Sequence, residues 1–240
     1  MLFMRLRAKL ATRRTGRAKL APRLIHIIFS AAIISMWLTL PSTVDAANTA
    51  TWCKWPWPWP TTVNYEIVSS HFTADHVNRI QYGGNTWSEG NFNLVLQRDL
   101  YGSRPNKVVK GNPDPSRPNV IARTAVGVID CHIDPSPQPY RTITQITTTF
   151  HNNVNWYSDC LAAGPTYCQT NNMHDLHNVA AHEFGHWFFL LDTYDSADSA
   201  DTMYGWISFG ETLKRTLNWH DRHQAWVMYG CRNGGSTYWC

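Results

Sequence analysis

The chain lacks an excess of charge of either sign once its first 46 residues are set aside. Those residues hold 8 of the 21 Lys and Arg but only 1 of the 17 Asp and Glu, so 13 basic and 16 acidic residues remain, a net charge of −3. The basic isoelectric point of the whole chain, about 8.8, therefore describes the leader. Proteins that bind nucleic acid carry a basic surface. We therefore expect no nucleic-acid partner.

A second long apolar run is also missing, because the one present extends from Leu24 to Leu40 within the leader. Basic residues precede this run, and the small residues near Val44 and Ala46 suit a cleavage site. Residues 1–46 are therefore predicted to be a secretory signal peptide. The run has about 17 residues, the lower limit for crossing a bilayer, so an uncleaved membrane anchor is the alternative. With the leader removed, we expect a secreted protein without a stable membrane span.

Cysteine is scarce but even in number, with six residues after the leader. In an exported chain this number predicts up to three disulfides, for which fifteen pairings are possible. We expect two local bridges, Cys160–Cys168 and Cys231–Cys240, the second within a C-terminal tail of residues 231–240. Cys53 and Cys131 then remain to pair with each other.

Tryptophan and proline gather in one segment, residues 47–60, where they alternate from Trp55 to Pro60. Such alternation favours an extended, polyproline-like backbone. The indoles either grip sugar rings or proline-rich peptides, or lie across the following domain and bury their own apolar area. We favour the second interpretation, an N-terminal strap.

Metal-binding residue types cluster in one run, His182–Asp192, which has the sequence HEFGHWFFLLD. On a helix, His182 and His186 project from the same face and can close on one metal ion, with Glu183 beside it. A zinc ion with an open position lowers the pKa of water, and a neighbouring glutamate can act as general base. An exposed amphipathic helix is the alternative, but apolar neighbours such as Val179 and Phe184 favour a buried helix whose ionisable groups need partners.

A third ligand has to follow a turn in the chain. A helix continued from His186 to residue 192 would rise about 9 Å, too far for bonds of about 2 Å to one ion. Asp192 is the first side chain that can return to the metal after such a turn. An acidic cluster follows it and leads to Thr202–Gly205; its members are Asp195, Asp198 and Asp201.

This run and the later DTMYG (residues 201–205) resemble the metzincin metallopeptidases, and among them the matrixin-like group. The lead-in from Asp175 and the closing stretch Leu217–Gly230 are similar to that group too. An aspartate as third ligand resembles the snapalysin-like bacterial enzymes. The resemblance implies that Glu183 is the general base and that Met203 is the methionine of the turn, with Tyr204 beside it; the zinc ligands would be His182, His186 and Asp192.

The resemblance covers residues 61–230 and implies an α+β protein with the metzincin fold. That fold has a twisted five-stranded mixed sheet, an active-site helix, a methionine turn and a C-terminal helix. Residue patterns in this domain predict a helix over Ala74–Trp87, with Val77, Ile80 and Trp87 in the core, and an exposed loop over Ser103–Pro118. They also predict four strands, at Thr62–Val68, Phe92–Leu96, Val120–Ile129 and Arg141–Phe150.

The chain departs from the family pattern at two places. Phe189 stands where the pattern has glycine, so either the backbone there is strained by about 1–3 kcal/mol or the helix continues and turns at Leu190 and Leu191. In the second case Asp192 would miss the zinc. The histidine- and aspartate-rich loop that carries further metals in animal matrixins is also missing, so we expect a single zinc ion.

Cys53 has an alternative role to a disulfide partner. In matrixins a propeptide cysteine can occupy the open zinc position and keep the enzyme inactive, so the resemblance implies that Cys53 could do the same.

These features predict a monomeric zinc endopeptidase that acts on protein or peptide substrates. The resemblance implies that the substrate pairs with an edge strand, which we expect at 144–150, with Thr144 and Ile146 in contact. Trp206, Ile207 and Phe209 are expected to wall the pocket for the first residue beyond the cut and to favour a large apolar one. A catalytically inactive binding protein on the same scaffold is the alternative. A structural zinc protein is less favoured, because no cysteine lies near the motif.

Overall fold

A mixed sheet forms one layer of the computed structural model, which describes residues 53–55, 60–130 and 141–232. Strands β3 (Leu94–Arg98), β2 (Thr61–Ile67), β4 (Lys107–Gly111) and β6 (Arg141–His151) run parallel in that order. Strand β5 (Ala122–Asp130) pairs antiparallel with β6, and the two-residue β1 (Cys53–Lys54) is parallel to the start of β6. The protein is therefore an α+β protein with five longer strands.

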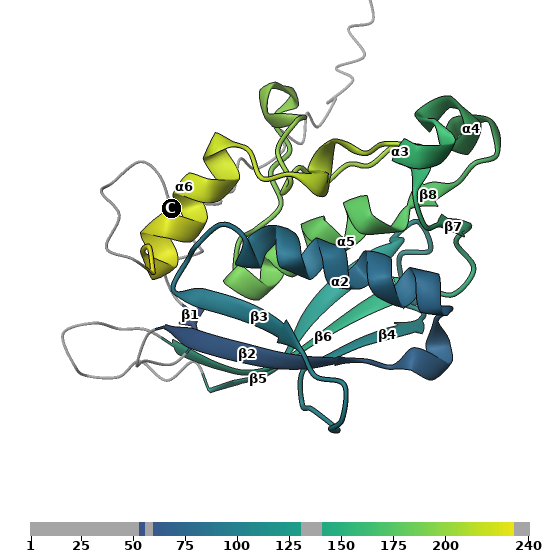
Figure 1. The fold of residues 1–240 in the computed structure, drawn as a ribbon. Coiled ribbons are helices and arrows are strands. Elements are labelled where there is room, and N and C mark those ends of the chain that lie inside the picture. Colours follow the sequence, from purple (N-terminus) through teal and green to yellow (C-terminus); the bar gives the residue numbers. More distant parts are fainter. Residues whose placement is uncertain (1–52, 56–59, 131–140, 233–240) are drawn as a thin grey trace, which may run out of the picture. The chain divides into compact units, whose positions relative to one another are not determined.

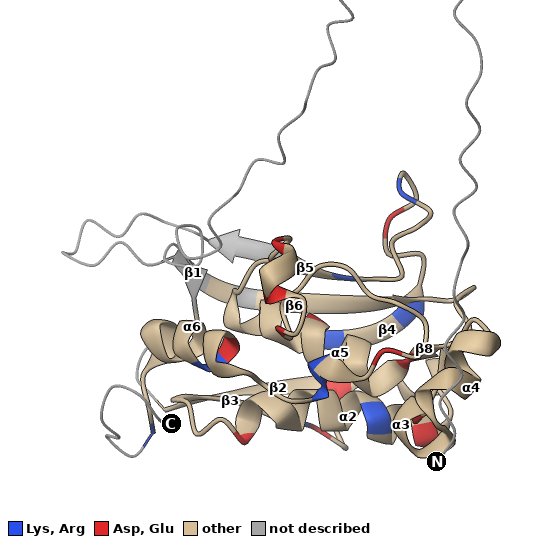
Figure 2. Cartoon of the chain, turned by 90° about the horizontal axis from the view of Figure 1, so that it is seen from above, with Lys and Arg blue, Asp and Glu red and all other residues tan. Residues whose placement is uncertain are grey.

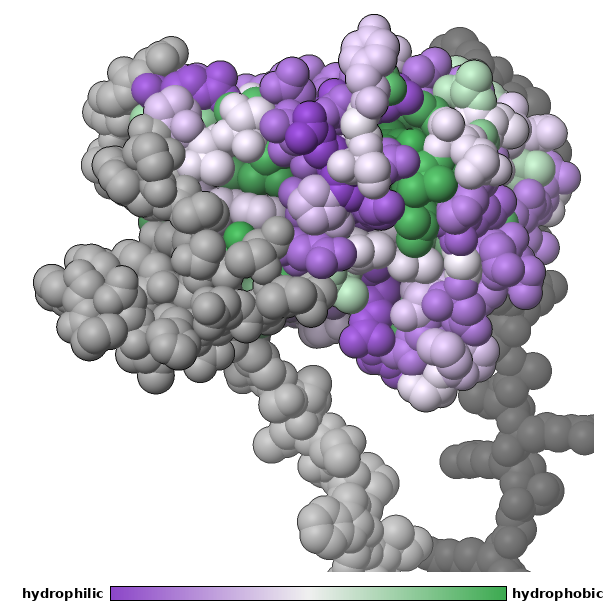
Figure 3. Space-filling view, turned by 90° about the horizontal axis from the view of Figure 1, so that it is seen from below, coloured by the Kyte–Doolittle hydropathy of each residue, from purple (hydrophilic) through white to green (hydrophobic). Residues whose placement is uncertain are grey.

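Two helices cover one face of this sheet, α2 (Ala74–Ser88) and α5 (Leu176–Gly185) (Figure 1). The opposite face is largely hydrophilic, with separate hydrophobic patches (Figure 3). Sheets with one solvated face show alternating apolar and polar residues, which explains the patterns of β2 and β6. The remaining elements are α3 (Cys160–Ala163), α4 (Pro165–Thr170), α6 (Trp219–Tyr229), the short strands β7 (Trp156–Tyr157) and β8 (His174–Asp175), and four 3₁₀ turns at Ser69–His71, His186–Phe188, Ser196–Asp198 and Leu213–Arg215.

The predicted first strand and first helix are confirmed to within one residue at their ends. Strand β2 buries its alternate residues Val63, Tyr65 and Ile67. Helix α2 begins after Thr73, whose side chain accepts a hydrogen bond from the backbone N–H of His76. Its predicted core contacts, Val77, Ile80 and Trp87, are all buried.

The predicted exposed loop Ser103–Pro118 is wrong in its centre, because β4 lies there between β2 and β6. Val108 is fully buried, although polar and turn-forming residues surround the strand in the sequence. A five-residue segment carries too weak a pattern to compete with such neighbours. Hydrogen bonds to β2 on one side and to β6 on the other stabilise β4 despite this weak pattern.

The predicted edge strand is also wrong, because β6 pairs with β5 on one side and with β4 on the other. Ile146 is fully buried, and its backbone N–H donates to the side-chain oxygen of Asn106. Thr144 lies on the same interior strand. The alternation of isoleucine and threonine indicated a solvated face of the sheet and did not indicate an edge. The edge strand on this side is β5.

The structure bears on part of the disulfide and leader predictions. Cys160 and Cys168 form the predicted local disulfide. Cys231 is also disulfide-bonded. The proposed partners Cys131 and Cys240, the side chain of Cys53 and the signal peptide lie outside the described residues. Within the described ranges, no helix is long and apolar enough to cross a membrane.

The described part of the Trp/Pro-rich segment supports the strap interpretation. Trp55 is buried, and its indole N–H donates to the backbone oxygen of Trp187 at 2.8 Å. This contact connects the start of the domain to the turn that follows α5. The other tryptophans of residues 47–60 lie outside the described residues.

Candidate metal centre

Helix α5 carries the two histidines and ends at a turn that reverses the chain. The helix is capped by Asp175, whose carboxylate accepts from the backbone N–H of Asn178 at 2.8 Å. After Gly185 the chain forms one 3₁₀ turn, His186–Phe188, and Phe189 then adopts a left-handed backbone with φ 60° and ψ 28°. The backbone N–H of Leu190 donates to the Gly185 oxygen and closes the turn. The turn thus occurs at Phe189, and the alternative of a longer helix is excluded.

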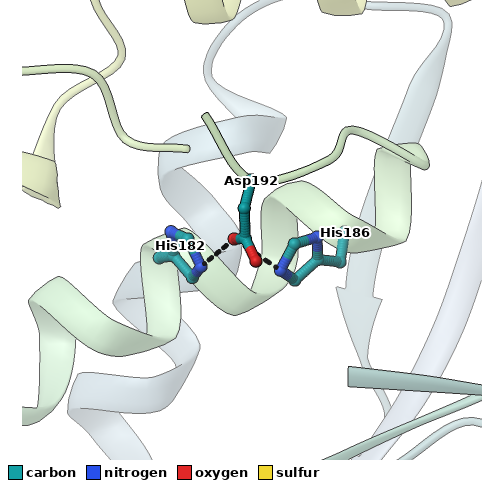
Figure 4. Close-up of side chains that lie close together, drawn as sticks. All are labelled: His182, His186 and Asp192. Atoms are coloured by element: carbon teal, nitrogen blue, oxygen red, sulfur yellow. Dashed lines mark ion pairs between the residues drawn. The ribbon is translucent and has the colours of Figure 1, made fainter. Parts of the chain in front are cut away.

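This turn brings the three predicted metal-binding side chains together (Figure 4). Asp192 Oδ1 lies 3.0 Å from His182 Nε2 and 3.5 Å from His186 Nε2. One ligand atom from each residue lies within 4.8 Å of the others. The three groups are thus close enough to surround a single ion.

The backbone fixes which nitrogen of each imidazole is available to a metal. His182 Nδ1 lies 2.8 Å from the Thr202 oxygen, and His186 Nδ1 lies 2.7 Å from the Leu190 oxygen. A carbonyl can only accept, so both Nδ1 atoms donate and both Nε2 lone pairs face Asp192. This is the arrangement found in metal-binding histidines.

The space between the three side chains requires a positive charge. Asp192 Oδ1 is buried and accepts no hydrogen bond of normal geometry from the described residues. Two nitrogen lone pairs and this oxygen would repel each other unless a proton or a cation lay among them. The residues therefore fit a cation, and two imidazoles with one carboxylate are a donor set that suits zinc.

The charges of the site support this description. Burial lowers the pKa of His186, but the carboxylates of Asp192 and Glu183 outweigh it and raise the pKa to about 9. Burial raises the pKa of Asp192, but His182 and His186 outweigh it and hold the pKa of that carboxyl well below its usual range. Both shifts mean that the site favours positive charge between the imidazoles and the carboxylate.

Met203, the methionine that the resemblance assigns to the turn, packs next to Gly185 at the end of α5. It is buried, and a Cβ on Gly185 would lie 2.1 Å from the Met203 sulfur, so only glycine fits at that position. Backbone hydrogen bonds join Thr193 to Met203 and Gly205 and hold the turn beside Asp192. Sequence reasoning did not single out Gly185, although a glycine between two histidines on a helix is a detectable signal.

A cleft of about 1200 Å³ opens in front of these residues. Glu183 and all three candidate ligands line it, with β5 on one side and the segment from Tyr204 to Phe209 on the other. The predicted wall residues Trp206, Ile207 and Phe209 line the cleft, whereas Ile146 does not. The side chain of Thr144 lies outside the described part of the structure. Asp192 also accepts a hydrogen bond from Tyr194, another residue of the cleft that sequence reasoning missed.

The cleft contains charged groups that the apolar pattern of residues 206–209 did not predict. Lys214 is buried and bonds to Glu211 and to the backbone oxygen of Trp206. Its ammonium group also lies 5.7 Å from the centre of the Tyr204 ring. Arg117 and Arg123 also line the cleft and share the carboxylate of Asp114. The lining of the cleft is thus apolar in part and charged in part.

A second group of metal-binding residue types lies nearby, and hydrogen bonds account for it. His220 Nδ1 lies 3.2 Å from Asp201 Oδ2 and 3.8 Å from Asp198. Asp201 also accepts from the side chain of Asn218. These contacts join the acidic loop to α6, and they satisfy the groups without an ion.

Comparison with known proteins gives no relative from which a function could be inferred. No protein-family model matches the chain, and no curated protein matches it.

Proposed function

We propose that this chain is a secreted zinc-dependent endopeptidase of the matrixin-like, metzincin kind. The observation that carries the proposal is the convergence of His182 Nε2, His186 Nε2 and Asp192 Oδ1 in an open cleft, with Glu183 beside them. Catalytic zinc sites have three protein ligands and keep a further position open, unlike closed structural sites.

The architecture around the site supports the same proposal. A mixed sheet, a helix carrying the histidines, a buried methionine beneath it and a C-terminal helix are what the resemblance implies. The disulfide Cys160–Cys168 is compatible with an oxidising compartment. A single zinc ion and a monomeric enzyme remain part of the proposal.

The residues of the chain would divide the chemistry between them. A zinc ion held by the two histidines and Asp192 would supply a Lewis acid and lower the pKa of water. Glu183 would accept a proton at its carboxylate and deliver it to the nitrogen of the leaving amine. The backbone oxygens of Thr202 and Leu190 would keep His182 and His186 aligned on the same ion, and Asp192 would complete the set of three ligands.

The peptide substrate would lie along β5, which replaces the strand expected from the sequence. Among the described strands, β5 is at the edge of the sheet beside the cleft, so its outer backbone groups can bind an extended peptide as an added strand. Trp206 and Ile207 would then contact the side chain that follows the cleaved bond.

The test is the metal content and casein hydrolysis of the purified protein beside Glu183→Gln. We expect one zinc per chain, loss of activity with a chelator and recovery with zinc. The variant should retain zinc and lose about 10²–10⁴-fold in kcat, because it lacks the base. Glu89→Gln, at an exposed glutamate after α2, is the control for the loss of one charge. Zinc binding without turnover in the wild-type protein would instead favour a binding protein on this scaffold.

A further inference from the structure

Two threonines on neighbouring strands lie between the sheet and the candidate general base. Thr124 of β5 and Thr148 of β6 are directly opposite each other in the register of the two strands. Their hydroxyl oxygens are 2.7 Å apart, as in a cross-strand threonine pair. Thr148 is buried, whereas Thr124 reaches the cleft.

The ends of this pair determine the direction of its hydrogen bonds. The indole N–H of Trp187 can only donate, and it lies 2.9 Å from Thr148 Oγ1. Thr124 Oγ1 lies 2.7 Å from Glu183 Oε2, and a carboxylate can only accept. Each hydroxyl has one proton, so Thr148 donates to Thr124 and Thr124 donates to Glu183. Thr124 Oγ1 also lies 3.2 Å from the backbone oxygen of Glu183, so both of its possible acceptors on α5 belong to Glu183.

We infer that Thr124 is a positioning residue, which fixes the Glu183 carboxylate as a proton acceptor through the hydrogen-bond chain Trp187–Thr148–Thr124–Glu183. The inference rests on the proposed function, because the role of Glu183 as a base comes from it. Trp187, Thr148 and Glu183 are all buried, so little water competes for these groups. Strand β5 would thus both bind the peptide and, through Thr124, hold the Glu183 carboxylate in place.

These hydrogen bonds also connect Glu183 to the turn after α5. Trp187 follows the candidate ligand His186, and its own backbone oxygen accepts from Trp55. Trp187 therefore links the N-terminal segment through its backbone oxygen to the hydrogen bonds that its indole starts towards Glu183. Rigid support of this kind keeps a catalytic group in its productive geometry.

Thr124→Val tests the role of Thr124 in turnover, because valine keeps the shape and lacks the hydroxyl. We expect kcat to fall about 10–100-fold, while KM and the zinc content stay unchanged. Thr124→Ser restores the donor and should recover most of the turnover. Thr149→Val is the matched control, because Thr149 is the next residue on β6 and faces the other side of the sheet. An unchanged kcat in Thr124→Val, or loss of its zinc, would overturn the positioning role.

A second measurement needs neither zinc nor activity. Urea unfolding of the metal-free wild type, Thr124→Val, Glu183→Ala and the double variant forms a double-mutant cycle. We expect the shift in midpoint of the double variant to be smaller than the sum of the two single shifts, because each single variant already breaks the same bond. Additive shifts would refute the hydrogen-bond chain, whereas a zinc-bound but inactive wild type would refute the peptidase, so the two failures are distinguishable.

Discussion

Phe189 occupies a backbone conformation that a residue with a large side chain rarely adopts. Its φ of 60° lies in the left-handed region, which costs an L-residue about 1–2 kcal/mol. The ring packs against the hydrophobic core, and the backbone N–H donates to the His186 oxygen. Packing thus offsets the strain. The strained turn brings Asp192 back to the two histidines, so the candidate metal centre depends on it.

Replacing Phe189 separates the strain from the packing. Phe189→Gly and Phe189→Ala both remove the ring, but only glycine relieves the left-handed conformation. We therefore expect Phe189→Gly to have a free energy of unfolding about 1 kcal/mol higher than that of Phe189→Ala, measured by urea denaturation. Equal stability of the two variants would contradict the strain.

Helix α6 supports the candidate metal centre from a distance in the sequence. Its first turn contains Asp221, whose buried carboxylate accepts from the backbone N–H groups of Thr202, Met203 and Asn218. Burial raises the pKa of Asp221, and these hydrogen bonds partly oppose the effect. The oxygen of Thr202 in turn accepts from His182. The orientation of one candidate ligand therefore depends on the helix.

Asp221→Ala should weaken both the fold and the metal site. It leaves three backbone donors without their acceptor, so we expect a loss of about 2–4 kcal/mol in the free energy of unfolding. Zinc affinity, measured by competition with a chromophoric chelator, should fall about 10–100-fold. Asp221→Asn keeps one acceptor oxygen, so its free energy of unfolding and its zinc affinity should both fall less than those of Asp221→Ala. Unchanged zinc affinity in Asp221→Ala would show that the helix does not orient His182.

Basic and acidic residues are interspersed along the described elements of the chain (Figure 2). A half-buried histidine makes the stability of the fold depend on pH. His177 lies on α5, where burial and the neighbouring Arg215 lower its pKa to about 4, although Asp175 and Asp159 act in the opposite direction. In the unfolded chain a histidine has a pKa of about 6.5. The unfolded state therefore takes up the proton first as the pH falls.

Stability should decrease as the pH falls from about 6.5 to about 4, because the unfolded state binds more protons over that range. We expect His177 to account for about 1–3 kcal/mol of the loss. His177→Gln should reduce the slope of the free energy of unfolding between pH 7 and pH 5, measured by urea denaturation at each pH. His71→Gln, at an exposed histidine, is the control. The same slope in His177→Gln and the wild type would contradict the assignment.

The sequence by itself determined the parts that depend on short-range patterns. The spacing of His182 and His186 placed both rings on one face of a helix, and alternation placed β2 and β6. The short separation of Cys160 and Cys168 favoured the disulfide that is observed. These features were predictable because each depends on the periodicity or spacing of nearby residues.

Only the tertiary structure decided how these parts meet. It placed β4 inside the sheet and β5 at its edge, because strand order depends on pairing energies with distant strands. It also selected Thr202 and Leu190 as the acceptors that orient the two imidazoles, and Thr124 as the donor to Glu183. The contacts of His182 with Thr202 and of Thr124 with Glu183 join residues far apart in the sequence, so their meeting depends on the packed fold, and the contact of His186 with Leu190 depends on the left-handed turn at Phe189.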